Sequence, residues 1–207
     1  MEYFITLTSI IVTALLSLWV GNIMYYKQAK IETRWKLLMS IKEDIYTSKK
    51  IACQCLDEFA IIFKSANQRD NVEIDIRNLQ NLINGLTERK NSIYMYQLLY
   101  EQTLSKHKFK EKIYYPGSSI YRKNREFTEF LKNIWHTIDS DIHRLQNVHN
   151  LLNKELIKYS SNIIDSTKLT RSIIEIINQV HASDYKTYQI DEIALYQFMN
   201  PTFKQII

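Results

Sequence analysis

The chain has 207 residues, of which 27 are basic and 22 are acidic, and its formal net charge at pH 7 is +5. Only three glycines and two prolines occur, and this scarcity favours long helices over tight turns. Because the glycines lie at positions 21, 85 and 117, they cannot form a glycine-rich phosphate-binding loop. The composition therefore excludes the common nucleotide-binding motifs and predicts an all-α fold.

The N-terminal segment predicts a membrane anchor. Residues 3–26 carry no charged side chain, and a helix of this length crosses the ~30 Å hydrocarbon layer of a bilayer. Lys27, Lys30 and Arg34 follow it, and basic residues beside a span tend to stay in the cytoplasm. We therefore predict a transmembrane anchor over residues 1–26, with its N-terminus outside the cell, and a cytoplasmic helical bundle domain over residues 27–207.

A cleaved signal peptide is the alternative for this segment. Signal peptides begin with basic residues and end at a small-x-small cleavage site. Here the basic residues follow the apolar run, and residues 22–26 offer no such site. The pattern therefore favours a retained anchor over a cleaved leader.

The helices expected after the anchor follow from apolar residues repeated at helical spacing. They cover residues 27–66, 72–112, 119–156, 166–180 and, as a short last helix, 191–199. The predicted fold is a single N-terminal transmembrane helix continuing into an elongated antiparallel bundle of about four helices. The residues expected in its core are Ile31, Trp35, Leu38, Ile41, Ile45, Ala52, Leu56, Phe59, Phe63, Val72, Ile76, Leu79, Ile83, Leu86, Ile93, Tyr100, Leu104, Phe127, Leu131, Ile134, Ile138, Ile142, Leu145, Leu152, Leu156, Leu169, Ile173, Ile176, Ile177 and Val180.

The strongest break in the pattern is a basic and aromatic turn around Pro116 and Gly117. If the second long helix returns the chain toward the anchor, this turn lies near the lipid headgroups, where basic and aromatic residues bind. The predicted surface is Lys108, Lys110, Lys112, Tyr114, Tyr115, Tyr121, Arg122 and Lys123. A turn that only meets solvent is the plainer interpretation, and single-stranded nucleic acid is a less favoured third partner.

Four small residues repeat every fourth position in the apolar segment: Ser9, Thr13, Ser17 and Gly21. Such a line lets two membrane helices approach closely. We therefore expect the chain to form homo-oligomers through this face, although serine and threonine also occur in spans by chance. The same line gives the only support for a membrane-perturbing effector that assembles through its span.

The residues from Arg144 to His149 have the Arg-x4-His spacing. At this point the chain resembles HEPN ribonucleases, helical bundles that cut RNA, usually as dimers. The resemblance implies that Arg144 stabilises phosphate charge and that His149 transfers a proton. The family favours a polar residue after the arginine, whereas this chain has Leu145. His149 also falls on the apolar repeat, which favours a packed core histidine.

The remaining candidates for chemistry lack the partners that a site needs. His136, Asp139 and His143 share one helix face, but no further metal ligand is specified on another helix. Cys53 and Cys55 point away from each other on a helix and cannot form a disulfide. No cofactor or metal is predicted, and an enzyme is less favoured than a non-enzymatic protein.

The predicted function is a membrane-anchored scaffold, sensor or effector component that presents a helical surface in the cytoplasm. Host-defence and toxin-type effectors often combine a small helical domain with one span, and the prediction includes such a role. The expected partners are membrane lipid, a second copy of the chain and a further protein. The two alternatives are a membrane-tethered ribonuclease using Arg144 and His149, and the membrane-perturbing effector.

Overall fold

The computed structural model describes residues 2–68, 71–111 and 119–190, and these residues form helices without any strand. Four α-helices account for most of them: α1 (Glu2–Gln68), α2 (Val72–Glu111), α3 (Ser119–Ser160) and α4 (Ser166–Asn178). Two 3-10 turns follow, η1 (Ala182–Asp184) and η2 (Thr187–Gln189). The predicted all-α bundle is confirmed, whereas the predicted last helix at 191–199 lies outside the described residues.

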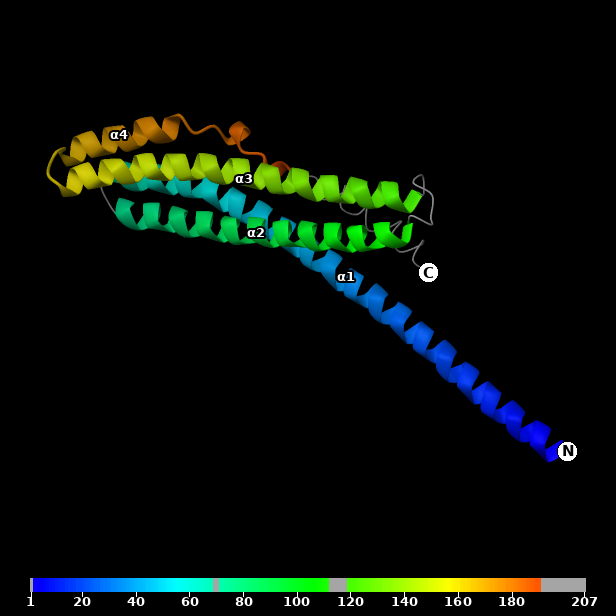
Figure 1. Ribbon diagram of the computed structural model, residues 1–207. Helices are drawn as coiled ribbons and strands as arrows, with labels where there is room; N and C mark the ends of the chain where they lie inside the picture. Colours follow the sequence, from blue (N-terminus) through cyan, green and yellow to red (C-terminus); the bar gives the residue numbers. More distant parts are fainter. Residues whose placement is uncertain (1, 69–70, 112–118, 191–207) are drawn as a thin grey trace.

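The helices form an elongated bundle from which the N-terminal part of α1 projects (Figure 1). The second half of α1 packs against α2, and α2 packs against α3. The shorter α4 lies on α3 and α1 at the end of the bundle far from the N-terminus. We call this far end the tip of the bundle.

Individual contacts fix the antiparallel order of the long helices. Asp44 on α1 pairs with Arg89 on α2, and Ile51 lies opposite Gly85, so residue numbers rise on one helix as they fall on the other. Lys90 on α2 likewise pairs with Asp139 on α3 at 2.8 Å. The chain therefore runs out along α1, back along α2 and out again along α3.

The core is one continuous cluster, and most of the residues predicted for it are buried. The prediction for the end of α1 is wrong by one position, because Phe63 is exposed and Ile62 is fully buried. Cys55 is also fully buried, whereas its neighbour Leu56 is only partly buried. Residues three or four apart share a helix face. The buried face that includes Cys55 and Ile62 therefore supplies the contacts of α1 with α2 and with α4 near the tip.

The helix ends follow local sequence signals. Asn71, just before α2, has a φ of 41°, a left-handed conformation that asparagine tolerates better than most residues. Asn162 has a φ of 57° after α3, where the N–H groups of Asn162 and Ile163 donate to the carbonyls of Tyr159 and Lys158. This pair of bonds is a Schellman motif, which ends a helix. Asp165 then caps α4 by accepting a hydrogen bond from the Lys168 N–H at 2.8 Å.

Replacing Gly85 by Ala should stabilise the protein by about 0.5–1 kcal/mol, because alanine has the higher helix propensity. A methyl group at this position would lie 3.6 Å from Ile51 Cδ1, which is an ordinary van der Waals contact. Urea unfolding of the wild type and of Gly85→Ala measures the difference. A loss of stability instead would mean that the close packing of α1 against α2 requires a residue without a side chain at position 85.

Within the described ranges, no helix is both long enough and apolar enough to cross a membrane. The predicted anchor over residues 1–26 therefore gains no support from this finding. The side chains of residues 1–12, 14, 15 and 26 lie outside the described ones, although the backbone of residues 2–68 is one helix.

Candidate functional site

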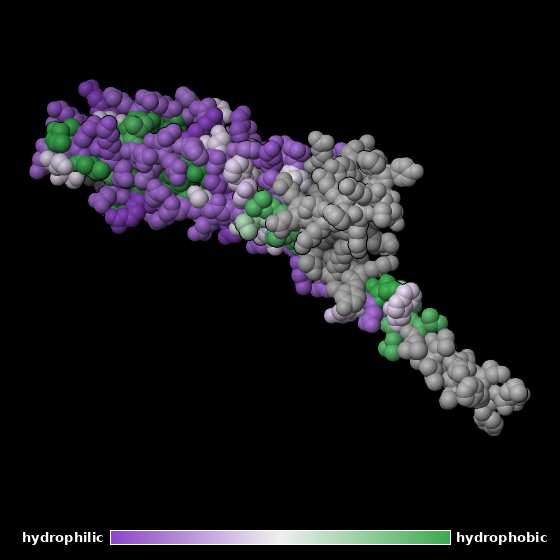
Figure 2. Space-filling view, in the orientation of Figure 1, coloured by the Kyte–Doolittle hydropathy of each residue, from purple (hydrophilic) through white to green (hydrophobic). Residues whose placement is uncertain are grey.

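The projecting part of α1 displays large apolar side chains without any helix packed on them. Leu18 is 67% exposed and Tyr25 is 70% exposed. Consecutive residues on an α-helix differ by about 100° in direction, so the exposed residues surround the helix and form no single stripe. The set comprises Leu16, Leu18, Trp19, Val20, Ile23, Met24 and Tyr25. Figure 2 shows this hydrophobic part of the projecting helix beside the largely hydrophilic bundle.

A helix that is apolar on every side is stable only when something covers it. A partner helix covers one stripe, whereas lipid or several helices together cover the whole circumference. The projecting part of α1 is therefore the first candidate for a functional surface.

The line of small residues lies on this same segment. The Ser17 hydroxyl donates to the Thr13 carbonyl of its own helix at 2.9 Å, as serine often does inside a helix. Gly21 has no heavy atom within 4 Å of the place where a side chain would begin. The face along Thr13, Ser17 and Gly21 is thus open in a single chain, while the Ser9 side chain lies outside the described ones.

The predicted basic and aromatic surface falls on side chains outside the described ones. Lys108 and Lys110 belong to the last turns of α2, and Tyr121, Arg122 and Lys123 belong to the first turns of α3. Lys112, Tyr114 and Tyr115 lie outside the described residues altogether. Figure 1 shows that α2 ends and α3 begins at the end of the bundle from which α1 projects, the placement that the sequence predicts.

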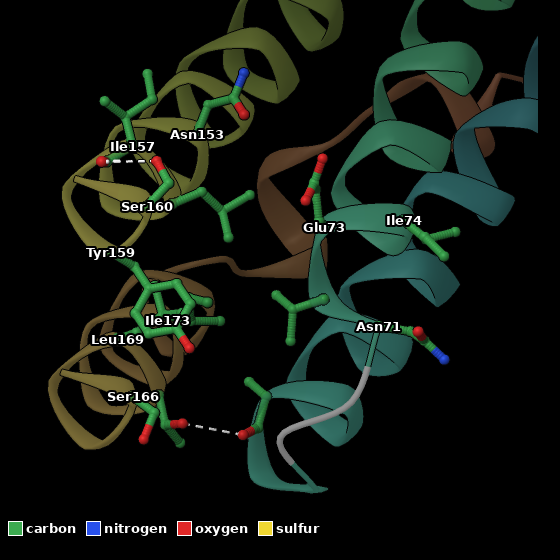
Figure 3. Close-up of a pocket in the computed structure, with 14 residues that line it drawn as sticks. Asn71, Glu73, Ile74, Asn153, Ile157, Tyr159, Ser160, Ser166, Leu169 and Ile173 are labelled. Carbon is green, nitrogen blue, oxygen red and sulfur yellow. Dashed lines mark hydrogen bonds between the residues drawn. The ribbon is translucent and has the colours of Figure 1, made fainter. Parts of the chain in front are cut away.

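The second candidate surface is a pocket of about 610 Å³ at the tip. It lies between the first turn of α2, the last turns of α3 and the first turns of α4 (Figure 3). Its apolar walls are Val72, Ile74, Leu156, Ile157, Leu169 and Ile173. Its volume is in the usual range of about 300–1,000 Å³ for ligand sites, which often form between the helices of bundles.

Three of the polar side chains around the tip pocket have partners within the protein. The Thr170 hydroxyl donates to the Ala66 carbonyl at 3.1 Å and joins α4 to the end of α1. The Ser160 hydroxyl donates to the Ile157 carbonyl at 3.0 Å (Figure 3). Glu73, which is the one charged residue among the described lining residues, pairs with Arg77 at 3.1 Å. Because the other described lining residues are uncharged, the pocket is suited to an uncharged group.

A third feature is the segment after α4, which Asp141 holds against the bundle. Asp141 on α3 is only 1% exposed, and its Oδ2 accepts hydrogen bonds from the backbone N–H groups of Lys186 (2.7 Å) and Thr187 (2.6 Å). Tyr185 is buried with its ring centroid 6.5 Å from that of Phe59 on α1. Burial, and next the charge of Asp141, raise the pKa of the Tyr185 hydroxyl to about 12. The segment thus packs against both α1 and α3.

The residues of the Arg-x4-His pattern have different environments. Arg144 is exposed and lines a hollow of about 420 Å³ with His181 and Tyr185. His149 is only 7% exposed and is not among the residues that line this hollow. Burial lowers the pKa of His149, and a hydrogen bond with Asn150 offsets only part of this effect. The imidazole is therefore neutral at pH 7. The structure does not bring the two side chains together in one hollow.

The other titratable candidates are also engaged or buried. Asp139 pairs with Lys90, and His143 Nδ1 lies 2.9 Å from the Asp139 carbonyl. Among the described residues, no group of three or more His, Cys, Asp and Glu side chains is arranged to hold a metal ion. Burial, and next the charge of Glu58, raise the pKa of the Cys55 thiol to about 12. A thiol with this pKa is a poor nucleophile at pH 7.

Comparison of the chain with protein-family models, curated proteins and solved structures finds no match. The resemblance to HEPN ribonucleases therefore rests on Arg144 and His149 alone.

Sequence reasoning missed the tip pocket and the contacts of Asp141. The pocket combines residues from α2, α3 and α4, and a single sequence does not show which helix ends meet. Asp141 had one available signal, because it lies at helical spacing from the core residues Ile138 and Leu145. A carboxylate on an apolar face predicts a buried hydrogen-bonding role.

Proposed function

We propose that this chain is a membrane-anchored scaffold or sensor component that acts without catalysis. The projecting part of α1 attaches the chain to a lipid bilayer, and the helical bundle carries the surfaces that meet other proteins. The observation that carries the proposal is the ring of exposed apolar side chains on that helix, which lies within a run of 24 uncharged residues, 3–26. Lipid covers such a helix on all sides, as a single partner helix cannot.

The mechanism is positioning. Because α1 is one helix from Glu2 to Gln68, the anchor and the bundle share a single rigid element about 100 Å long. The tip pocket lies at the end of the bundle away from the N-terminus, so it faces away from the bilayer. Confinement to a surface raises the effective concentration of the chain for partners on the same membrane and for further copies of itself.

The orientation follows from charge. Lys27, Lys30 and Arg34 come directly after the apolar run, and they favour a cytoplasmic bundle with the N-terminus outside. The basic residues at the end of α2 and the start of α3 add a second attraction to anionic headgroups, on the order of 1 kcal/mol per residue near the surface.

Membrane fractionation of cells that express the full chain tests the anchor. Wild type should pellet with membranes, resist carbonate and dissolve in detergent, with a C-terminal tag protected from protease added outside. Leu16→Lys combined with Val20→Lys places two charges in the anchor and should move most of the protein to the soluble fraction.

The matched control is Met39→Lys combined with Ile61→Lys. These residues are also exposed and apolar on α1, but they belong to the part that packs in the bundle. The control protein should stay with the membranes. Full-length wild type in the soluble fraction, or loss of the tag to outside protease, would refute the proposal.

No specific observation favours the ribonuclease over this function, since His149 is buried and Arg144 is exposed elsewhere. The membrane-perturbing effector shares the anchor with the proposed function and adds assembly along Ser9, Thr13, Ser17 and Gly21. An apolar span without ionisable residues gives it no evident conducting path.

A further inference from the structure

The tip pocket leads from the surface of the bundle to its core. Ala66 at the end of α1 and Leu169 and Ile173 on α4 are buried residues that line it. Ile74 on α2 and Ile157 on α3 line it as well, and they are 53% and 62% exposed. A molecule that fills the pocket therefore rests on the core and covers both exposed isoleucines.

The lining of the pocket offers no charge that is free to bind a ligand. Glu73 is the one charged residue among the described lining residues, and it is paired with Arg77 on its own helix. An ion that enters such a place loses its hydration and gains no counter-ion, which makes its binding unfavourable. The lining therefore fits an uncharged molecule.

The pocket also carries polar side chains that have no hydrogen-bond partner among the described atoms. They are the Asn153 carboxamide and the Tyr159 hydroxyl near the end of α3 and the Ser166 hydroxyl at the start of α4. In Figure 3 the Tyr159 ring lies beside Leu169 and Ile173, so hydrogen-bonding groups and apolar wall occur together. Ligand pockets combine apolar walls with a few polar groups that fix the orientation of the ligand.

We propose that the tip pocket binds an uncharged amphiphilic small molecule, with its apolar body on Leu169 and Ile173 and its polar head bonded to Asn153 or Tyr159. The volume of about 610 Å³ exceeds what one side chain of a partner protein fills, so the pocket is sized for a whole small molecule. The short α4 packs on α3 and α1, whereas α2 meets it across the pocket (Figure 3). The bound molecule therefore joins α4 to the first turn of α2.

Methyl NMR of the full chain in mild detergent tests the site with indole as the probe. Indole is uncharged and combines an apolar ring system with one N–H donor. At free concentrations fixed by dialysis, it should shift the methyl signals of Val72, Leu169 and Ile173 along one saturable curve. Indole-3-carboxylate is the charged counterpart and should bind at least about tenfold more weakly.

Two variants with matched exposure locate the probe. Ile157→Trp narrows the mouth of the pocket and should weaken indole binding at least about tenfold. Ile163→Trp changes an exposed residue of the tip that is not among the lining residues, and it should alter the affinity less than about twofold. Asn153→Ala combined with Tyr159→Phe removes both acceptors for the indole N–H and should weaken binding about fivefold.

The wild-type titration does not require a variant to fold. Pocket methyl signals that stay in place, or that move without saturating, would overturn the site, as would equal weakening by Ile157→Trp and Ile163→Trp. Equal or tighter binding of the carboxylate would overturn the uncharged class, and unchanged affinity after loss of both acceptors would overturn the amphiphilic class. The inference goes beyond the proposed function and does not depend on membrane attachment, so the two can fail separately.

Discussion

Replacing Asp141 by Ala should lower the free energy of unfolding by about 3 kcal/mol, the largest effect we expect from a single polar side chain here. Its carboxylate binds the backbone N–H groups of Lys186 and Thr187, and hydrogen bonds to a charged group contribute about 1.5–3 kcal/mol each. The variant leaves both N–H groups without an acceptor, the one of Thr187 in a buried place and the one of Lys186 in a partly buried place. The other carboxylate oxygen, Oδ1, already lacks a partner among the described atoms, so we place the estimate at the lower end of the combined range of about 3–6 kcal/mol.

The loss should be local as well as global. Hydrogen exchange at the amides of Lys186 and Thr187 should lose its protection first, because the segment after α4 is held at these two points. Tyr185 should then leave its contact with Phe59 and open the groove between α1 and α3.

Asp57→Ala is the matched control, since it removes an exposed carboxylate from α1 and should change stability by less than about 0.5 kcal/mol. Urea unfolding of the full chain in mild detergent measures both variants. Unchanged amide protection in Asp141→Ala would show that apolar contacts alone hold the segment.

The helix bounds and the core show what the sequence predicts and what it does not. Helical spacing predicted the long helices, the break before Val72 and most of the core, because each depends on residues close in the chain. The position of Phe63 was predicted wrongly because two apolar residues, Ile62 and Phe63, compete for the same face. Only the packing of α2 and α4 on α1 decides between them.

The candidate surfaces also divide into those that depend on residues close in the chain and those that depend on residues far apart in it. The apolar segment and the small-residue line are local patterns, and the sequence alone identifies them. The tip pocket needs the ends of three helices to meet, and the Asp44–Arg89 ion pair needs the register between α1 and α2. Such long-range relations are not encoded in any short stretch of the chain.

The second large effect is expected at the ion pair between Asp44 and Arg89, whose atoms lie 2.8 Å apart. Arg89→Met should lower the free energy of unfolding by about 2 kcal/mol, because it leaves a carboxylate that is only 7% exposed without its cation. We expect less than the full penalty of a buried pair, since the Arg89 side chain is 43% exposed and Tyr96 also forms a hydrogen bond with Asp44.

Two comparisons separate the buried charge from the loss of a long side chain. Arg77→Met breaks an exposed pair with Glu73 on the same helix and should cost no more than about 0.5 kcal/mol. In an Asp44→Asn background the carboxylate charge is gone, so Arg89→Met should then cost about 1 kcal/mol less than in wild type. Equal costs in both backgrounds would show that Arg89 stabilises the interface of α1 and α2 through packing of its aliphatic chain alone, and the pair would contribute nothing as a pair.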